Sequence, residues 1–189
     1  MDSNEIADEI WLAARATLFQ VSPRNEIVLQ EVPAPARLAP NSIAFSAEVN
    51  LHESDEIASG KFVVLHDPDG QPTWSGTFRV VTFVNADVEA DVVTDELFDE
   101  VAWSWLTESL DNTSATYDGL SGTVTRTASR SFAQLADRDR ETQLEIRASW
   151  SPLSQELSSH LSAWCELLER AAGLEPLPEG VTSLSRKFQ

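Results

Sequence analysis

Hydrophobic and polar residues alternate along this chain with two different periods, and the change of period marks the expected elements. Residues 3–19 place Ile6, Ile10 and Ala13 at helical spacing, which predicts an N-terminal helix. The stretch EIVLQEV, residues 26–32, is short and β-branched and predicts a strand. The proline-rich residues 33–40 cannot continue either element, so we expect a linker within the domain or a cover over a sheet edge.

Strict alternation then predicts a run of strands. Ile43, Phe45 and Leu51 fall on one side of a strand, opposite Glu48. The stretches GKFVVLHD and TWSGTFRVVTFV follow, and the sequence Asp-Pro-Asp-Gly at 67–70 is a strong turn signal between them. We therefore expect a β-hairpin.

The second half of the chain repeats this change of period. Residues 88–110 predict a helix, or two short helices meeting near Asp95, and the stretches YDGLSGTVTRTASRSF and TQLEIRASW predict two strands. A final helix is expected to begin at Ser151 and Pro152 and to end at Gly173. The prediction is an α+β fold: an antiparallel sheet of about six strands, with N-terminal, middle and C-terminal helices packed mainly on one face. Residues 1–175 would form one domain, followed by a loosely held tail at 176–189.

The motif VAWSWLTESL contains two tryptophans that could form a ligand platform or belong to the core. In a helix, positions two apart diverge by roughly 160°, so one platform cannot hold both rings. We expect Trp105 in the core and Trp103 at its rim, where it could anchor an interface. The three tryptophans on other apolar stretches, Trp74, Trp150 and Trp164, are also expected in the core.

The formal charge of -18 disfavours a general nucleic-acid binder and an anionic membrane surface as partner. Two interpretations stay open, namely solubility and steering toward a basic partner. The N-terminal stretch MDSNEIADEI carries acids where a signal peptide carries Lys or Arg, and no apolar run reaches the roughly 18 residues of a membrane span. With a single cysteine, Cys165, we expect a cytoplasmic protein.

Few residues suggest reaction chemistry. The three histidines, His52, His66 and His160, form no pair with metal-ligand spacing, and His160 is expected on the flank of the last helix. The acidic stretch HESDE, 52–56, is expected to be a solvated loop and not a cation site, because it lacks the pattern of an EF-hand. Cys165 is expected to behave as a small hydrophobe. Nucleotide, dinucleotide and serine-hydrolase motifs do not occur, so we assign no catalytic residue, metal or cofactor.

Arginines gather in one part of this otherwise acidic chain. Arg126, Arg130 and Arg147 fall in neighbouring strands, and Arg79 lies in the earlier hairpin. If their side chains share the solvent face of the sheet, they form a patch of forked donors for a carboxylate or phosphate. The alternative is cross-strand ion pairing with acids such as Glu48 and Glu145.

A resemblance to a known family extends over nearly the whole chain. It is carried by six stretches: LQEVPAPARLAP, LHDPDGQPTWSGTFRVVTFV, WSWL, GTVTRTASRSF, LEIRASWSPL and HLSAWCELL. They resemble an actinobacterial family of unknown function, number 3000, which implies a cytoplasmic bacterial protein with no catalytic residues to transfer. The order of elements also looks like the secretion-chaperone-like fold, whose members often dimerise and bind partner segments on sheet or helix surfaces.

Three hypotheses about function follow. The first is a non-enzymatic interaction protein, chaperone-like and able to form a homodimer, whose negative field favours a partner with a basic surface. The second is a small-anion binder or enzyme that uses the arginine patch, and it requires a pocket converging on Arg126 and Arg147. The third, a regulator acting on RNA, requires those arginines to overcome the charge of -18.

Overall fold

The computed structural model describes residues 3–51, 56–89, 95–135 and 141–176. The elements occur in the expected order of helix, four strands, helix, two strands and helix. Their bounds are α1 Ser3–Leu18, β1 Ile27–Val32, β2 Asn41–Asn50, β3 Glu56–His66, β4 Phe78–Asp87, α2 Phe98–Asn112, β5 Tyr117–Ser129, a 3-10 turn Ala133–Leu135, β6 Glu141–Pro152 and α3 Ser158–Ala171. The expected tail, 176–189, lies outside the described residues except for Pro176.

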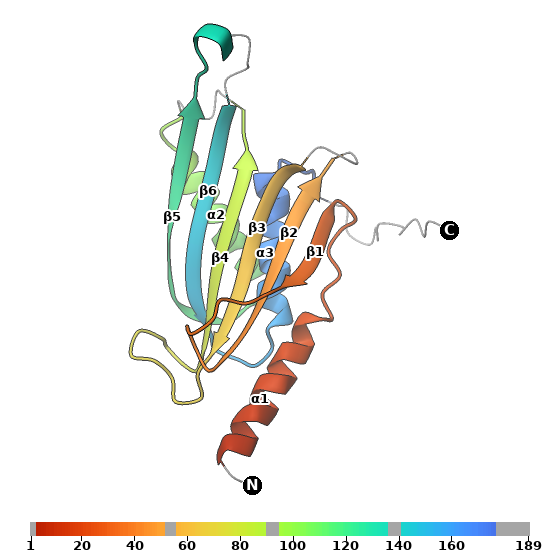
Figure 1. Cartoon of the computed structure of the whole chain (residues 1–189), viewed down its shortest axis with the longest axis vertical. Coiled ribbons are helices and arrows are strands. Elements are labelled where there is room, and N and C mark those ends of the chain that lie inside the picture. Colours follow the sequence, from red (N-terminus) through yellow and green to blue (C-terminus); the bar gives the residue numbers. More distant parts are fainter. Residues whose placement is uncertain (1–2, 52–55, 90–94, 136–140, 177–189) are drawn as a thin grey trace, which may run out of the picture.

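The six strands form one antiparallel sheet in the order β1-β2-β3-β4-β6-β5. In Figure 1, α2 and α3 lie behind the sheet and α1 extends below its lower end. This confirms the α+β class. Strands that follow one another in the chain are paired, except for β4 and β5. Strand β6 lies between these two and pairs with both. The central strands of the sheet are therefore β3, β4 and β6.

Alternate residues of each strand face the helices and form the core. Phe62 of β3, Val80 and Val84 of β4 and Ile146 of β6 are fully buried on this inner face. The indole of Trp164 on α3 packs against Phe62, with ring centroids 5.6 Å apart. Burying such side chains supplies the main favourable term in folding, about 1.5–3 kcal/mol for each large aliphatic or aromatic residue.

A glycine permits the closest approach of α3 to the sheet. A Cβ added to Gly60 would lie 2.9 Å from Cζ2 of Trp164, closer than real Cβ atoms come to a neighbour. The carbonyl oxygen of Phe83, on the adjacent strand, would be closer still. Gly60 is therefore required because the indole lies directly on the backbone of β3.

The start of the last helix differs from the prediction. Pro152 is the last residue of β6 and pairs with Tyr117, because the ladder continues through Ser151 and does not end there. The helix begins at Ser158, where the carboxylate of Glu156 accepts the backbone amides of Ser158 at 3.1 Å and Ser159 at 3.2 Å. A proline at the end of a strand and one at the first turn of a helix look alike in sequence.

The end of that helix is as expected. Gly173 has φ of +68° and donates its amide to the carbonyl oxygen of Arg170 at 3.0 Å. Leu174 donates to Glu169 at 2.9 Å. This pair of hydrogen bonds is a Schellman motif, which satisfies the last carbonyls of a helix.

The connection between β1 and β2, residues 33–40, crosses in front of the lower part of the sheet in Figure 1. The carbonyl oxygen of Leu38 in this connection accepts a hydrogen bond from Gln71 Nε2 at 3.3 Å, which links it to the loop after β3. As expected of a proline-rich segment that is extended or turning, it forms no helix or strand, and it turns at residues 36 and 37, where Arg37 has φ of +71°. The segment lies across a face of the sheet and does not cover an edge.

Candidate functional site

The candidate site is the face of the sheet that points away from the helices, which we call the open face. In the described part of the chain the three helices pack on the opposite face (Figure 1). Because side chains alternate along a strand, the open face receives Lys61, Val63, Val81, Phe83 and Arg147. Above the crossing connection, these side chains define the accessible middle of the sheet.

Strand register brings two cations to either side of an aromatic ring. Phe83 of β4 pairs with Lys61 of β3 on one side and with Arg147 of β6 on the other. With strands about 4.8 Å apart, the Cα atoms of the two cations are about 10 Å apart. The guanidinium carbon of Arg147 lies 5.6 Å from the centroid of the Phe83 ring, within cation–π range. We call these three residues the cation–aromatic row.

Arg147 is also held by a carboxylate. Its Nε lies 2.7 Å from Oε1 of Glu145, two residues earlier on the same strand. The side chain of Arg147 nevertheless stays 65% exposed, so its remaining donors face solvent. The alternative of ion pairing is therefore realised for this arginine, but along one strand and not across two.

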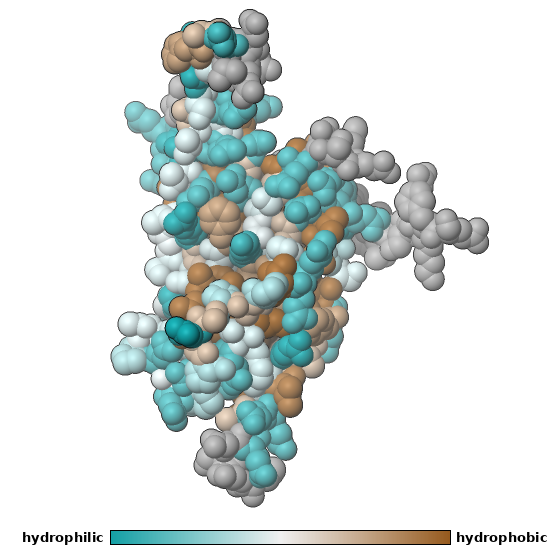
Figure 2. All heavy atoms as spheres, viewed as in Figure 1, coloured by the Kyte–Doolittle hydropathy of each residue, from teal (hydrophilic) through white to brown (hydrophobic). Residues whose placement is uncertain are grey.

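An apolar hollow lies next to the cation–aromatic row. Its volume is about 470 Å³, and its lining includes Lys61, Val63, Val81, Phe83, Arg147 and Ser149. Val81 and Val63 are cross-strand partners, and Val81 is 41% exposed. Figure 2 shows apolar surface in the middle of this face, bordered by polar side chains. Apolar surface with a polar rim is typical of an interaction site.

Arg79 supplies a third cation on the open face, in contact with Ser149 of the hollow's lining. It lies two residues before Val81 on β4, so both side chains point to the open face. Its guanidinium donates to Ser149 Oγ at 2.6 Å, Ser151 Oγ at 3.2 Å and the carbonyl oxygen of Gly119 at 3.2 Å. These partners are neutral, and partial burial lowers the pKa of Arg79 from its ordinary value.

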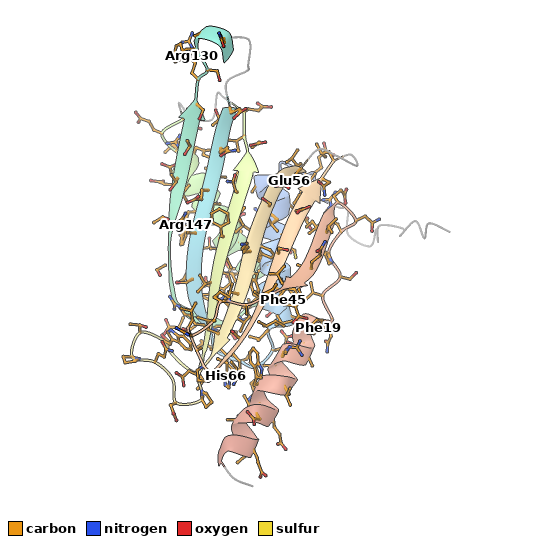
Figure 3. The ribbon with its side chains drawn as sticks, in the orientation of Figure 1. Phe19, Phe45, Glu56, His66, Arg130 and Arg147 are labelled. Carbon is orange, nitrogen blue, oxygen red and sulfur yellow. The ribbon has the colours of Figure 1, made fainter. Side chains whose placement is uncertain are left out.

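The expected arginine patch does not form as one surface. Arg126 pairs across strands with Leu144, whose side chain faces the helices, so Arg126 lies on the opposite face from Arg147. There its Nε is 2.7 Å from Oδ1 of Asp99 on α2. Arg130 lies beyond the end of β5, with its guanidinium carbon 5.3 Å from the ring centroid of Phe132. Figure 3 shows Arg130 at the end of the sheet, far from Arg147 in the middle. The premise of a shared solvent face is therefore wrong for Arg126.

The two neighbouring tryptophans also differ from the prediction. Both Trp103 and Trp105 are half-buried, because the buried stripe of α2 runs through Phe98 and Leu106 and passes between them. With about 100° per residue, the two rings flank this stripe on opposite sides. Trp105 packs edge-on against Phe98, and Trp103 lies over Gly122 of β5, where an added Cβ would be 2.7 Å from its Cζ3. Trp103 thus anchors α2 to the sheet, and its role in an interface stays a prediction.

Among the other tryptophans, Trp150 and Trp164 are fully buried, as expected. Trp74 is not in the core: it is half-buried in the connection between β3 and β4. The strand begins only at Phe78, because the loop after His66 is longer than the turn signal at 67–70 suggests.

Two histidines, His66 and His160, and Cys165 lie away from the open face, and His52 lies outside the described residues. His160 is fully buried and not on a helix flank, and its Nδ1 accepts the Nε1 hydrogen of Trp150 at 3.0 Å. Burial lowers the pKa of His160 to about 4, against a smaller opposing effect of Glu156. His66 is buried and stacked on Trp11, with ring centroids 5.7 Å apart. Cys165 is buried, and burial raises its pKa to about 12. It packs as a small hydrophobe, as expected.

A metal centre finds no support in the part of the chain that the structure describes, where no cluster of His, Cys, Asp or Glu could hold an ion. The acidic stretch 52–56 lies outside the described residues except for Glu56, which begins β3.

Lys61 and Phe83 are the site residues that sequence reasoning missed. Lys61 is one of only two lysines in the chain, and the alternation in GKFVVLHD places it opposite the buried Phe62. That alternation was a usable signal. The pairing of Lys61 with Phe83, however, depends on the register of the hairpin, which a long connection does not determine.

Comparison with known proteins gives one result at the level of the family. We found no match to this chain among curated proteins or among solved structures, so the similarity to the secretion-chaperone-like fold stays a prediction. Among the described residues, no helix is long and apolar enough to cross a membrane. A family described as "Protein of unknown function (DUF3000)" matches residues 7–182, nearly the full length of the chain. The chain therefore belongs to the DUF3000 family.

Proposed function

We propose that this chain is a non-enzymatic protein-interaction module whose partner binds the open face of the sheet. The observation that carries the proposal is the apolar hollow lined by Lys61 and Arg147, with Arg79 bound to Ser149 at its side. Small-molecule sites enclose about 70–90% of their ligand, whereas this hollow opens onto a broad sheet. A broad surface with an apolar middle and a charged border is the arrangement that protein partners use.

The floor of the open face supports this role because it is rigid before binding. Val81 and Phe83 alternate with Val80 and Val84, which are fully buried against the helices. Each of the central strands is also hydrogen-bonded on both sides. A surface that is ordered in advance loses little conformational entropy when a partner binds.

The positions of the reactive side chains favour binding over catalysis. Cys165 lies on α3, and its raised pKa keeps the thiol protonated near neutral pH. His160 is buried on the same helix, with one ring nitrogen occupied by Trp150. Neither side chain reaches the open face, so neither can act on a molecule bound there.

Site-specific photo-crosslinking tests the proposal. A photoreactive phenylalanine analogue replaces Val81 on the open face, and a matched variant carries it at Val101 on α2. The two valines are similarly exposed, at 41% and 45%. In the cells that naturally make this chain, we expect a discrete crosslinked product from position 81 and none from position 101. Equal crosslinking from both positions, or none from position 81, would contradict the proposal.

A small-anion binder is the second candidate, and Arg79 favours it. A half-buried guanidinium held only by neutral oxygens in the described chain retains its full charge for a ligand. Calorimetric titration with inorganic phosphate and with citrate distinguishes the two functions. Saturable binding of either anion that Arg79→Ala abolishes would favour this second candidate over a protein partner.

A further inference from the structure

Resting on the proposed function, we infer that the partner segment on the open face is acidic and apolar, with carboxylates that contact Lys61 and Arg147 and an apolar side chain that fills the hollow. The net charge of the chain led to the opposite expectation, a basic partner. The arrangement of charges on the two faces of the sheet decides between them.

The open face concentrates cations at its centre. Lys61 and Arg147 line the hollow on either side of Phe83, and Arg79 lies beside it, bound to Ser149 of the lining. Among the described residues, no carboxylate lies within 4.0 Å of the Lys61 ammonium or the Arg79 guanidinium. Glu145 is bound to Arg147 and offsets one of the three charges.

Acidic residues gather instead in the helices. Helix α2 carries Asp99, Glu100, Glu108 and Asp111, and it contains no lysine or arginine. At physiological ionic strength, exposed charges more than about 8 Å apart are largely screened from one another. Since the sheet separates α2 from the open face, a bound segment meets mainly the charges of that face. Lys61, Arg79 and Arg147 lie at or beside the hollow, and the acids of the face include Glu145 on Arg147, Glu48 on β2 and Asp118 on β5.

The apolar floor determines the rest of the partner's chemistry. Val63, Val81 and the Phe83 ring offer no hydrogen-bond donor, so a polar side chain in the hollow would lose its hydration without compensation. Hydroxyl groups line the β5–β6 side of the hollow, at Ser121, Thr123 and Ser149, and the Ser149 oxygen accepts a hydrogen bond from Arg79. A basic segment would place cations beside Lys61 and Arg147, and repulsion would oppose binding. An acidic segment with one aliphatic or aromatic residue satisfies both the floor and the border.

Selection of peptides from a random displayed library tests this inference. The full chain is immobilised as wild type, as the charge reversal Lys61→Glu with Arg147→Glu, and as Val81→Asp. Val101→Asp serves as the matched control on the helix layer. Circular dichroism checks that each variant keeps its fold. Val81→Thr, which keeps the β-branched shape, repeats the test if Val81→Asp does not fold.

We expect wild type to enrich peptides that combine Asp or Glu with a large apolar residue. A resynthesised peptide, measured by fluorescence anisotropy, should bind the charge-reversed variant about tenfold more weakly or worse, because two exposed ion pairs are replaced by repulsion. Binding should fall with added salt, and Val101→Asp should leave it unchanged.

Other outcomes separate failure of the inference from failure of the proposed function. If wild type enriches Lys- and Arg-rich peptides, and Val81→Asp abolishes their binding, the inference of an acidic partner is wrong. The open face would remain the binding surface. If Val81→Asp leaves the binding of the enriched peptides unchanged, or if no peptide is enriched, both the inference and the proposed function are wrong. If sedimentation shows a dimer that Val81→Asp alone dissociates, the occupant is a second copy of the chain and the inference is wrong.

Discussion

The buried pair His160 and Trp150 makes the stability of this fold depend on pH in a defined way. Nδ1 of His160 accepts the indole hydrogen, so the neutral imidazole carries its own hydrogen on Nε2. Protonating Nδ1 would break this bond and place a charge in a fully buried position. These effects accord with the fall in the pKa of His160 from 6.5 to about 4.

The sign follows from proton linkage. Between pH 6.5 and about 4, the unfolded chain binds a proton at His160 and the folded chain does not. The contribution of the neutral His160 to the free energy of unfolding is therefore complete above pH 6.5 and is lost as the pH falls toward 4. Over the interval from pH 7 to pH 5, the loss in the free energy of unfolding comes to about 2 kcal/mol. Domains of this kind have a total stability of about 5–15 kcal/mol, so the effect is measurable.

Urea unfolding, followed by tryptophan fluorescence at pH 7 and pH 5, tests this prediction. His66 is buried and has a lowered pKa as well, so the wild-type slope includes both histidines. His160→Asn isolates one of them, because the amide oxygen can still accept from Trp150 and does not titrate. The variant should lose about 2 kcal/mol less stability than wild type over the same interval. Identical pH dependence in both proteins would refute the reasoning.

Three further predictions concern packing. Gly60→Ala should lower the free energy of unfolding by about 1–3 kcal/mol, because its Cβ meets Trp164, whereas Gly76→Ala, with open space around it, should change it little; urea titration measures both. Trp103→Ala and Trp105→Ala should cost similar amounts of stability, since both rings are half-buried, and a loss confined to Trp105 would contradict this. Cys165 should react with Ellman's reagent at pH 8 only after unfolding, because it is buried and its pKa is about 12; rapid reaction of the native chain would show that the helix layer opens.

The sequence was enough to predict the order of the elements because each one carries its own period. Strand β6 is the clearest case: Leu144, Ile146 and Ala148 alternate with polar residues, and all three are buried as expected. The same kind of alternation in β5 indicates the face on which Arg126 lies. It falls on the same side of β5 as Val124, which packs against the core, and opposite the threonines that face solvent.

The prediction was wrong for individual residues where the polarity of a side chain was given more weight than its position in the repeat of the helix or strand. His160 lies three residues after Leu157 and four before Trp164, so helical spacing places it on the buried face, and only its polarity suggested a flank. The cation–aromatic row was out of reach for another reason. It combines three strands, and their register depends on long-range pairing that no local pattern encodes.

The central claim, that a partner occupies the open face, can be tested most directly by thiol accessibility. Cys165 is buried, so Val81→Cys and Val101→Cys each introduce one reactive thiol, on the open face and on α2. Maleimide labelling is compared between the purified chain and the chain in its native cells. We predict that the thiol at position 81 reacts several-fold more slowly in cells, whereas the thiol at position 101 reacts alike in both. Equal labelling of position 81 in both settings would contradict the account.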